Sequence, residues 1–217
     1  MLYKKYLIYS IHVDVVKTVF MTKKLIIFIP SIEEGGVEKN LFIIANYLVQ
    51  KKLNIEVLSC NSNKSKYFNK KIKFIGPKSS FWQNKPRLIK YIVCILFLLI
   101  NLFKKRSNKL IFAFQANIYA ILIAKILCTK IIVRANSAPS GWSHNIIKKN
   151  LYSIIINLAD DVMVNSNDFR REFDKKFKIK SKCIYNPFYK AKLNANSNKH
   201  LFKKNSLKIL SIGRLTK

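Results

Sequence analysis

Two consecutive glycines, Gly35 and Gly36, lie between an apolar stretch that ends at Pro30 and a run of apolar residues with helical spacing. Glycine has no Cβ, so an anionic ligand can approach the backbone N–H groups of such a loop and the start of the helix that follows. The pair therefore favours contact with a phosphate or a nucleotide. The alternative is a tight turn that needs glycine for its positive φ.

Polar side chains follow four later apolar stretches, at the point where each stretch ends. They are Gln115, Asn117, Arg134, Asn136, Ser166 and Asn186. If these stretches are parallel strands of one sheet, their carboxyl ends share one edge, and the side chains line one cleft with the glycines. Amides, a hydroxyl and a guanidinium suit an anionic ligand that is rich in hydroxyl groups. Each residue alone also fits a helix cap or an ordinary surface position.

Strands and helices alternate along the whole chain, which predicts the elements that position these residues. Apolar and β-branched stretches predict strands at 24–29, 55–58, 72–75, 109–114, 130–133, 161–164 and 182–185. Helical spacing predicts helices at 37–48, 85–103, 118–127, 147–158 and 167–177. This alternation is typical of an α/β fold with a doubly wound, mostly parallel sheet of the Rossmann type.

Two of the expected helices have a clear apolar face. Residues Ile147, Leu151, Ile154, Ile155 and Leu158 face one way in the first, and Phe169, Phe173 and Phe177 do so in the second. Ser166 or Asn167 precedes the second helix and is a suitable cap for it.

The helix expected at 85–103 contains YIVCILFLLI, which is apolar on every face and has basic residues on both sides. A membrane span needs about 20 apolar residues, and this stretch is shorter. We favour a helix that is buried or partly interfacial within the α/β domain. A helix lying on the membrane surface and a transmembrane helix are the alternatives.

The formal net charge is +31, from 41 lysines and arginines against 10 acidic residues. Such an excess favours polyanions, which include nucleic acid, anionic lipid and phosphorylated substrates. The lysines are also scattered among asparagines and isoleucines, as in a proteome with biased composition, and charge carries no information about the fold.

The four cysteines, Cys60, Cys94, Cys128 and Cys183, are far apart in the sequence, and the three histidines do not cluster. No spacing is typical of a metal site or a redox motif, so we expect buried thiols, no metal and a reducing compartment.

The chain divides into four parts. Residues 1–21 read as an extension outside the core, with a membrane-contacting helix as the alternative, and 22–190 form the Rossmann-like domain. A polar linker follows at 191–206, and 207–217 read as the first strand of a second domain that is cut off. We therefore expect a truncated chain.

The order of four segments resembles a known family. They are the Pro-Ser-x-x-x-Gly-Gly-x-Glu loop, VNSNDFRREF, CIYNPF and LKILSIGRL. Together they resemble the family 4 glycosyltransferases, which are retaining enzymes of the GT-B fold. The resemblance spans about 23–215. It implies that this chain is the N-terminal, acceptor-side domain, and that most of the donor site lies in the second domain.

The resemblance also implies roles for single residues. Gly35 and Gly36 match the loop that lies against the phosphates and sugar of the donor, and Glu38 matches the acidic residue after it. Arg134 falls where many members have a histidine near the transferred sugar. Asn165 and Ser166 match the end of the sixth strand, and Asn186 with Pro187 matches the segment before the hinge. Arg214 matches an arginine that binds the diphosphate together with a later lysine.

The expected activity is transfer of a sugar from a nucleotide-sugar donor to a glycan or a polyprenyl-linked acceptor in surface polysaccharide synthesis. No cofactor or metal is implied, and the enzyme would lie in the cytoplasm, with contact to anionic lipid on the inner membrane face. The family's paired glutamates of the second domain are absent from this sequence, so the chain alone is expected to be inactive. A basic module that binds nucleic acid or an anionic membrane without catalysis is the alternative, although no RNA-binding or DNA-binding motif supports nucleic acid.

Overall fold

The computed structural model describes residues 24–33, 35–104, 109–137 and 145–187. The expected extension at 1–21, the linker at 191–206 and the strand at 207–217, with Arg214, lie outside the described residues.

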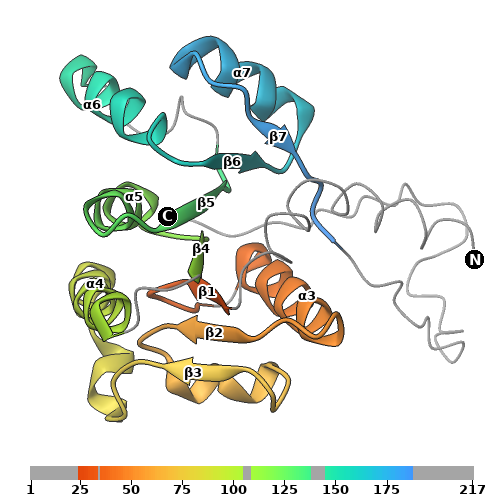
Figure 1. Ribbon diagram of the computed structural model, residues 1–217, viewed down its shortest axis with the longest axis vertical. Helices are drawn as coiled ribbons and strands as arrows, with labels where there is room; N and C mark the ends of the chain where they lie inside the picture. Colours follow the sequence, from red (N-terminus) through yellow and green to blue (C-terminus); the bar gives the residue numbers. More distant parts are fainter. Residues whose placement is uncertain (1–23, 34, 105–108, 138–144, 188–217) are drawn as a thin grey trace, which may run out of the picture.

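Seven strands form one sheet in the order β3-β2-β1-β4-β5-β6-β7 (Figure 1). Every neighbouring pair is parallel. The strands are β1 Lys24–Phe28, β2 Ile55–Leu58, β3 Lys73–Ile75, β4 Lys109–Ala113, β5 Lys130–Ala135, β6 Asp161–Val164 and β7 Lys182–Cys183. All the expected strands are present, and the predicted α/β fold class with a doubly wound parallel sheet is confirmed.

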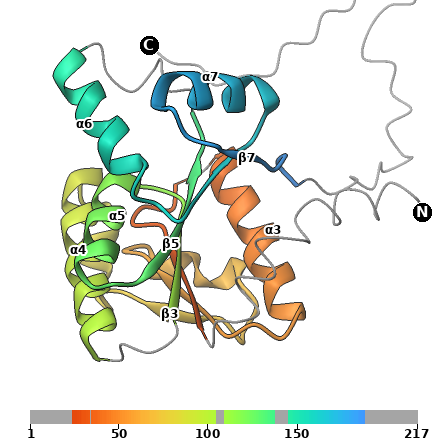
Figure 2. The ribbon, with the colours of Figure 1, turned by 45° about the horizontal axis from the view of Figure 1, so that its top comes forward.

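Helices cover both faces of the sheet. They are α3 Gly36–Gln50, α4 Arg87–Lys104, α5 Asn117–Ile126, α6 Ile146–Ile156 and α7 Asn167–Phe177, with two short 3-10 helices, η1 Ser62–Tyr67 and η2 Ser80–Asn84. Figure 2 shows α4, α5 and α6 together on one side of the sheet and α3 on the other.

Alternation along the central strands explains why each face can be buried. In β1, Ile26 and Phe28 pack in the core beneath α4, α5, α6 and α7, whereas Leu25 and Ile27 pack against α3. Strands that are covered on both faces consist of continuous apolar residues, which is the pattern that made them recognisable in the sequence.

The apolar face predicted for α7 is confirmed. Phe173 and Phe177 are buried, and their rings are 5.2 Å apart in an edge-to-face contact. Ser166 is the cap of this helix, because its Oγ accepts a hydrogen bond from the N–H of Phe169 at 3.1 Å.

The apolar face predicted for α6 exists, but most of it is not in the core. Ile155 is buried, whereas Ile147, Leu151, Ile154 and Leu158 are exposed. The helix packs on the sheet through Ile155 and Ile156. Helical spacing identifies an apolar stripe, but it does not specify which residues pack against the stripe.

One stripe of α4 is buried and the opposite stripe is exposed. Lys90, Cys94, Leu98 and Leu102 face the core, and the large side chains on the outside are Leu88, Ile92, Leu96, Ile100 and Phe103. The partly interfacial helix that we favoured agrees with this arrangement. Among the described residues, no helix is long and apolar enough to cross a bilayer, so the transmembrane alternative for α4 is wrong.

The expectation of buried thiols holds for two of the four cysteines. Cys60 and Cys94 are buried with their Sγ atoms 3.4 Å apart, whereas Cys128 is exposed and Cys183 is partly exposed. Cys128 is exposed because it follows α5 in a surface turn with a φ of 49°.

Candidate ligand-binding cleft

A cavity of about 680 Å³ lies at the carboxyl edge of the sheet. Its walls come from the loops after β1, β4 and β5, the first turns of α3, α4 and α5, and one residue of α6. The strand order changes direction between β1 and β4, and ligands of doubly wound folds bind outside the strand ends at this point. The volume is within the range of small-molecule sites.

The cavity brings together most of the residues that the sequence singled out. Gly35, Gly36, Gln115, Asn117, Arg134 and Asn136 all line it. Asn186 is not part of the wall, although its Oδ1 accepts a hydrogen bond from Nη2 of Arg134 at 2.6 Å. Ser166 is outside the cavity and caps α7.

The two glycines at the start of α3 are not required by the backbone. Gly35 is extended, with a φ of −177°, and a Cβ added to Gly36 would meet no atom within 4 Å. Gly76 is different, because its φ is 159° and a Cβ there would collide with the carbonyl of Ser59. The tight turn considered as an alternative for the pair is therefore wrong. The missing side chains leave the start of α3 open to the cavity.

Two helices begin at the cavity without a side-chain cap. Neither Gly35 before α3 nor Ala116 before α5 has a side chain that could accept a hydrogen bond from the first-turn N–H groups. Those N–H groups have no partner within their own helix and add to the positive end of the helix dipole. Ala116 also has a φ of 53°, which is unfavourable for a residue with a Cβ. The edge of the cavity thus presents several backbone donors.

Arg134 is the most deeply buried charged residue of the cavity, with 1% of its surface exposed. Its Nε donates to Oδ1 of Asn136 at 3.3 Å, and its guanidinium lies 5.9 Å from the ring centre of Phe114. Burial lowers the pKa of Arg134 to about 10, so the side chain is still cationic at neutral pH. Within the described ranges, no carboxylate forms an ion pair with it.

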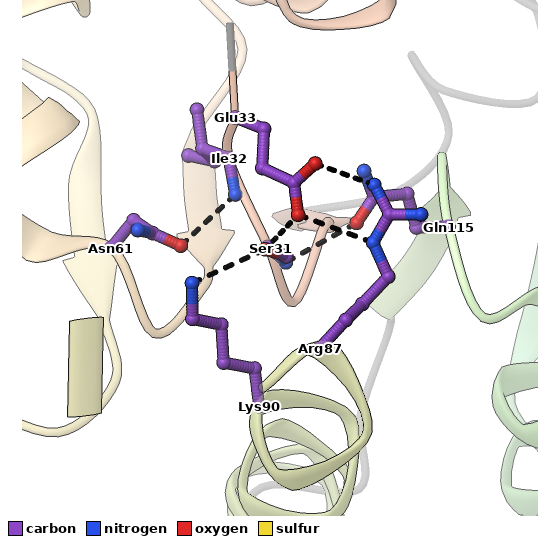
Figure 3. A network of polar contacts seen from close by, with 7 residues as sticks. All are labelled: Ser31, Ile32, Glu33, Asn61, Arg87, Lys90 and Gln115. Carbon is purple, nitrogen blue, oxygen red and sulfur yellow. Dashed lines mark hydrogen bonds and ion pairs between the residues drawn. The ribbon is translucent and has the colours of Figure 1, made fainter. Parts of the chain in front are cut away.

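A polar network holds the loop after β1 against α4 and β4 (Figure 3). Glu33 pairs with Arg87 at 2.7 Å and accepts a hydrogen bond from Oγ of Ser31 at 3.2 Å. The N–H of Ser31 donates to Oε1 of Gln115 at 3.2 Å, so Gln115 fixes the loop rather than pointing freely into the cavity. Burial alone would raise the pKa of Glu33, but Arg87 and Ser31 together lower it.

Sequence reasoning did not identify several residues of the wall. Glu33, Arg87, Tyr91 and Tyr152 line the cavity, and Arg87 is 54 residues from its partner Glu33. Burial raises the pKa of the Tyr91 hydroxyl. Tyr91 begins the apolar run of α4, and no spacing indicates that it faces a ligand. Glu38, noted from the family resemblance, is buried in the first turn of α3 and also lines the wall. Within the described ranges, no three histidine, cysteine or acidic side chains gather as a metal site would require.

The same architecture is found in solved glycosyltransferases. The fold resembles one domain of the GT-B enzymes. HepE of Anabaena, solved in complex with UDP-glucose, matches with a TM-score of 0.52 and 17% identity over 76% of this chain and 44% of HepE. A glycosyltransferase of Rickettsia africae matches with a TM-score of 0.54 and 20% identity over 76% of this chain and 43% of that one.

The chain spans less than half the length of these two structures, and at these identities the likeness concerns the fold. No protein-family model matches the chain, and no curated protein matches its sequence.

Proposed function

We propose that the chain is the N-terminal domain of a retaining glycosyltransferase of the family 4 type. The observation that carries this proposal is the open start of α3, where Gly35 and Gly36, neither with a positive φ, line a cavity at the reversal of strand order. Since neither glycine has a positive φ and a Cβ on Gly36 would meet no atom within 4 Å, we propose access for a ligand as the reason for them. The natural ligand for such an edge is the diphosphate of a nucleotide sugar, because helix N-termini bind anions through their free N–H groups.

The chemistry of sugar transfer is consistent with this site. A nucleoside diphosphate leaving group gains negative charge as the glycosidic bond breaks, and preorganised donors and cations stabilise that charge. We propose that Gly35 and Gly36 contribute such donors and that Arg214, which follows the described residues, contributes a cation. The structure of HepE with UDP and glucose supports a nucleotide-sugar donor for a domain of this architecture.

We also propose a glycan or polyprenyl-linked acceptor, as in surface polysaccharide synthesis, and contact with the inner face of the cytoplasmic membrane. The support is the outer surface of α4, α5 and α6, which we call the apolar face. It consists of the exposed side chains of Leu88, Ile92, Leu96, Ile100, Phe103, Leu122, Ile126, Ile147, Leu151 and Ile154. Figure 2 shows α4, α5 and α6 together on one side of the sheet, so these exposed apolar residues belong to three neighbouring helices.

The charges on the same three helices favour an anionic bilayer as the occupant of the apolar face. Lys104, Lys148 and Lys149 lie on these helices outside the core, and none of the three helices contains an aspartate or a glutamate. Apolar side chains that enter the interface and basic residues that meet anionic headgroups are the two contributions that hold a protein on a membrane surface.

The test is a titration of the isotope-labelled 217-residue chain with UDP-glucose and a panel of other nucleotide sugars, followed through backbone amide resonances. We expect shifts that concentrate at Gly35, Gly36 and the residues after β4 and β5. ATP, which has phosphates but no transferable sugar, serves as the control and should bind at least tenfold more weakly. Absence of any shift at the cavity with the whole panel would contradict the proposal.

A further inference from the structure

Arg134 carries a buried charge that the described protein does not neutralise. A buried ion normally has a counter-ion, because removing it from water costs several kcal/mol. The two acceptors of Arg134 are the neutral amide oxygens of Asn136 and Asn186, and its Nη1 makes no hydrogen bond among the described residues. The guanidinium is therefore held in place by neutral amides and has no carboxylate partner among the described residues.

The other charged side chains of the cavity wall do not neutralise Arg134. Arg87 is paired with Glu33 at 2.7 Å. Glu38 is in the first turn of α3, where the helix dipole stabilises a carboxylate. Neither Glu33 nor Glu38 supplies the anion that Arg134 lacks, since within the described ranges no carboxylate lies within 4 Å of the guanidinium.

Asn117 adds a second unsatisfied group to the same wall. Its Nδ2 donates to the carbonyl of Arg134 at 3.0 Å, so the two residues are direct neighbours. Its Oδ1 is buried and accepts no hydrogen bond. A buried acceptor without a partner costs about 1–3 kcal/mol, and a hydroxyl or N–H of a ligand would remove that cost.

We infer that Arg134 and Asn117 form a subsite for an anionic sugar, which places a phosphate or carboxylate on Arg134 and a hydroxyl on Oδ1 of Asn117. This inference rests on the proposed function and extends it, because it defines the class of the sugar that the N-terminal domain holds. A neutral sugar would satisfy Asn117 but would leave the guanidinium without a counter-ion. Hydrogen bonds with an ionised donor or acceptor are about twice as strong as neutral ones, and an anionic sugar also supplies the counter-ion.

The test compares three ligands on the full 217-residue chain by calorimetric titration at constant ionic strength. Glucose 1-phosphate, glucuronate and glucose share most hydroxyl groups and differ in charge. We expect at least one of the two anionic sugars to bind tenfold or more tightly than glucose, and the better one identifies phosphate or carboxylate as the natural group. Equal affinities for all three sugars would overturn the inference.

Arg134→Gln should reduce binding of the anionic sugar at least tenfold and leave binding of glucose unchanged. Arg171→Gln is the matched control, because it removes one positive charge from a side chain that is 80% exposed on α7. The control should change neither affinity.

Thermal melting without ligand separates a binding role from a structural one. Arg134→Gln removes the cost of keeping an unneutralised charge out of water, which is several kcal/mol. Arg134→Gln should therefore melt at or above the temperature of the parent chain. A variant that melts lower or does not fold would assign Arg134 to holding Asn136 and Asn186, and would overturn the subsite.

The calorimetric test of the subsite is independent of the nucleotide-sugar titration. Binding of anionic sugars without binding of any nucleotide sugar would contradict the proposed transferase and support the subsite. Binding of nucleotide sugars with equal affinities for the three simple sugars would support the transferase and contradict the subsite.

Discussion

Two glycines of this chain show how the same residue type can serve the fold or a ligand. Gly76 has a φ of 159°, and a Cβ added to it would lie 2.0 Å from the carbonyl oxygen of Ser59, so the backbone itself excludes a side chain. Gly36 has open space where a Cβ would be, and it lies at the cavity. The sequence shows only that both are glycines, and the backbone angles and neighbours distinguish their roles.

This difference predicts opposite results for the same substitution. Gly36→Ala should leave the free energy of unfolding unchanged or raise it by about 0.5–1 kcal/mol, since alanine restricts the unfolded chain. It should also lower nucleotide-sugar affinity about tenfold, because the added methyl group projects into the cavity. Gly76→Ala should cost about 2 kcal/mol or more through strain and collision. Urea denaturation and the amide titration measure the two effects, and unchanged affinity in Gly36→Ala would argue against a ligand at the start of α3.

At the scale of elements, the residue at the start of α7 stabilises the helix, whereas the residue at its end is unfavourable for helix stability. Ser166 supplies a side-chain cap at its start. Lys178, which ends it, has a φ of 53°, a conformation that usually selects glycine at the end of a helix.

The two ends of α7 should respond in opposite directions to substitution. Ser166→Ala should lower the free energy of unfolding by about 1 kcal/mol through loss of the cap. Lys178→Gly should raise it by about 1 kcal/mol, because glycine adopts the left-handed conformation without a penalty. Denaturation of both variants tests this. Neither substitution should alter ligand binding. A loss of sugar affinity in Ser166→Ala would indicate that Ser166 contacts the ligand.

The helices also show where sequence reasoning ends. Continuous apolar stretches located every strand, because a parallel sheet that is covered on both faces has no polar alternation. Helical spacing located α6 but not the environment of its apolar stripe, of which Ile147, Leu151 and Ile154 are exposed. Because the carboxyl ends of parallel strands share one edge, the sequence predicted that Gly35 and Arg134 line one cavity. Arg87 comes from the start of α4 and pairs with Glu33, 54 positions away. Such tertiary contacts leave no periodic signal.

At the scale of the whole molecule, the cavity and the apolar face lie on different parts of the domain. The sheet edge presents the cavity, and α4, α5 and α6 present the apolar face. All three helices belong to both, because Arg87 of α4, Asn117 of α5 and Tyr152 of α6 line the cavity. A membrane bound at the apolar face would therefore lie close to the cavity, as the proposed lipid-linked acceptor requires.

The apolar face leads to a prediction about vesicles. The chain should float with vesicles that contain phosphatidylglycerol and bind pure phosphatidylcholine vesicles more weakly, because anionic headgroups add to apolar burial. Substituting one exposed residue on each helix, in the triple variant Leu96→Ser, Ile126→Ser and Ile154→Ser, should reduce binding at least tenfold. The side chain of Ile126 is 76% exposed, so its loss should not affect the core.

A matched control and two competing occupants complete this experiment. Phe81→Ser with Tyr67→Ser removes exposed aromatic residues from η2 and η1, outside the three helices, and should leave vesicle binding unchanged.

Light scattering shows whether a second copy of the chain covers the apolar face instead, in which case the triple variant would convert a dimer to a monomer. Binding to oligonucleotides that weakens steeply with salt, without any binding to vesicles, would favour the nucleic-acid module. Either result would contradict the membrane proposal, because the apolar face can contribute to bilayer binding only if it is free to enter the lipid interface.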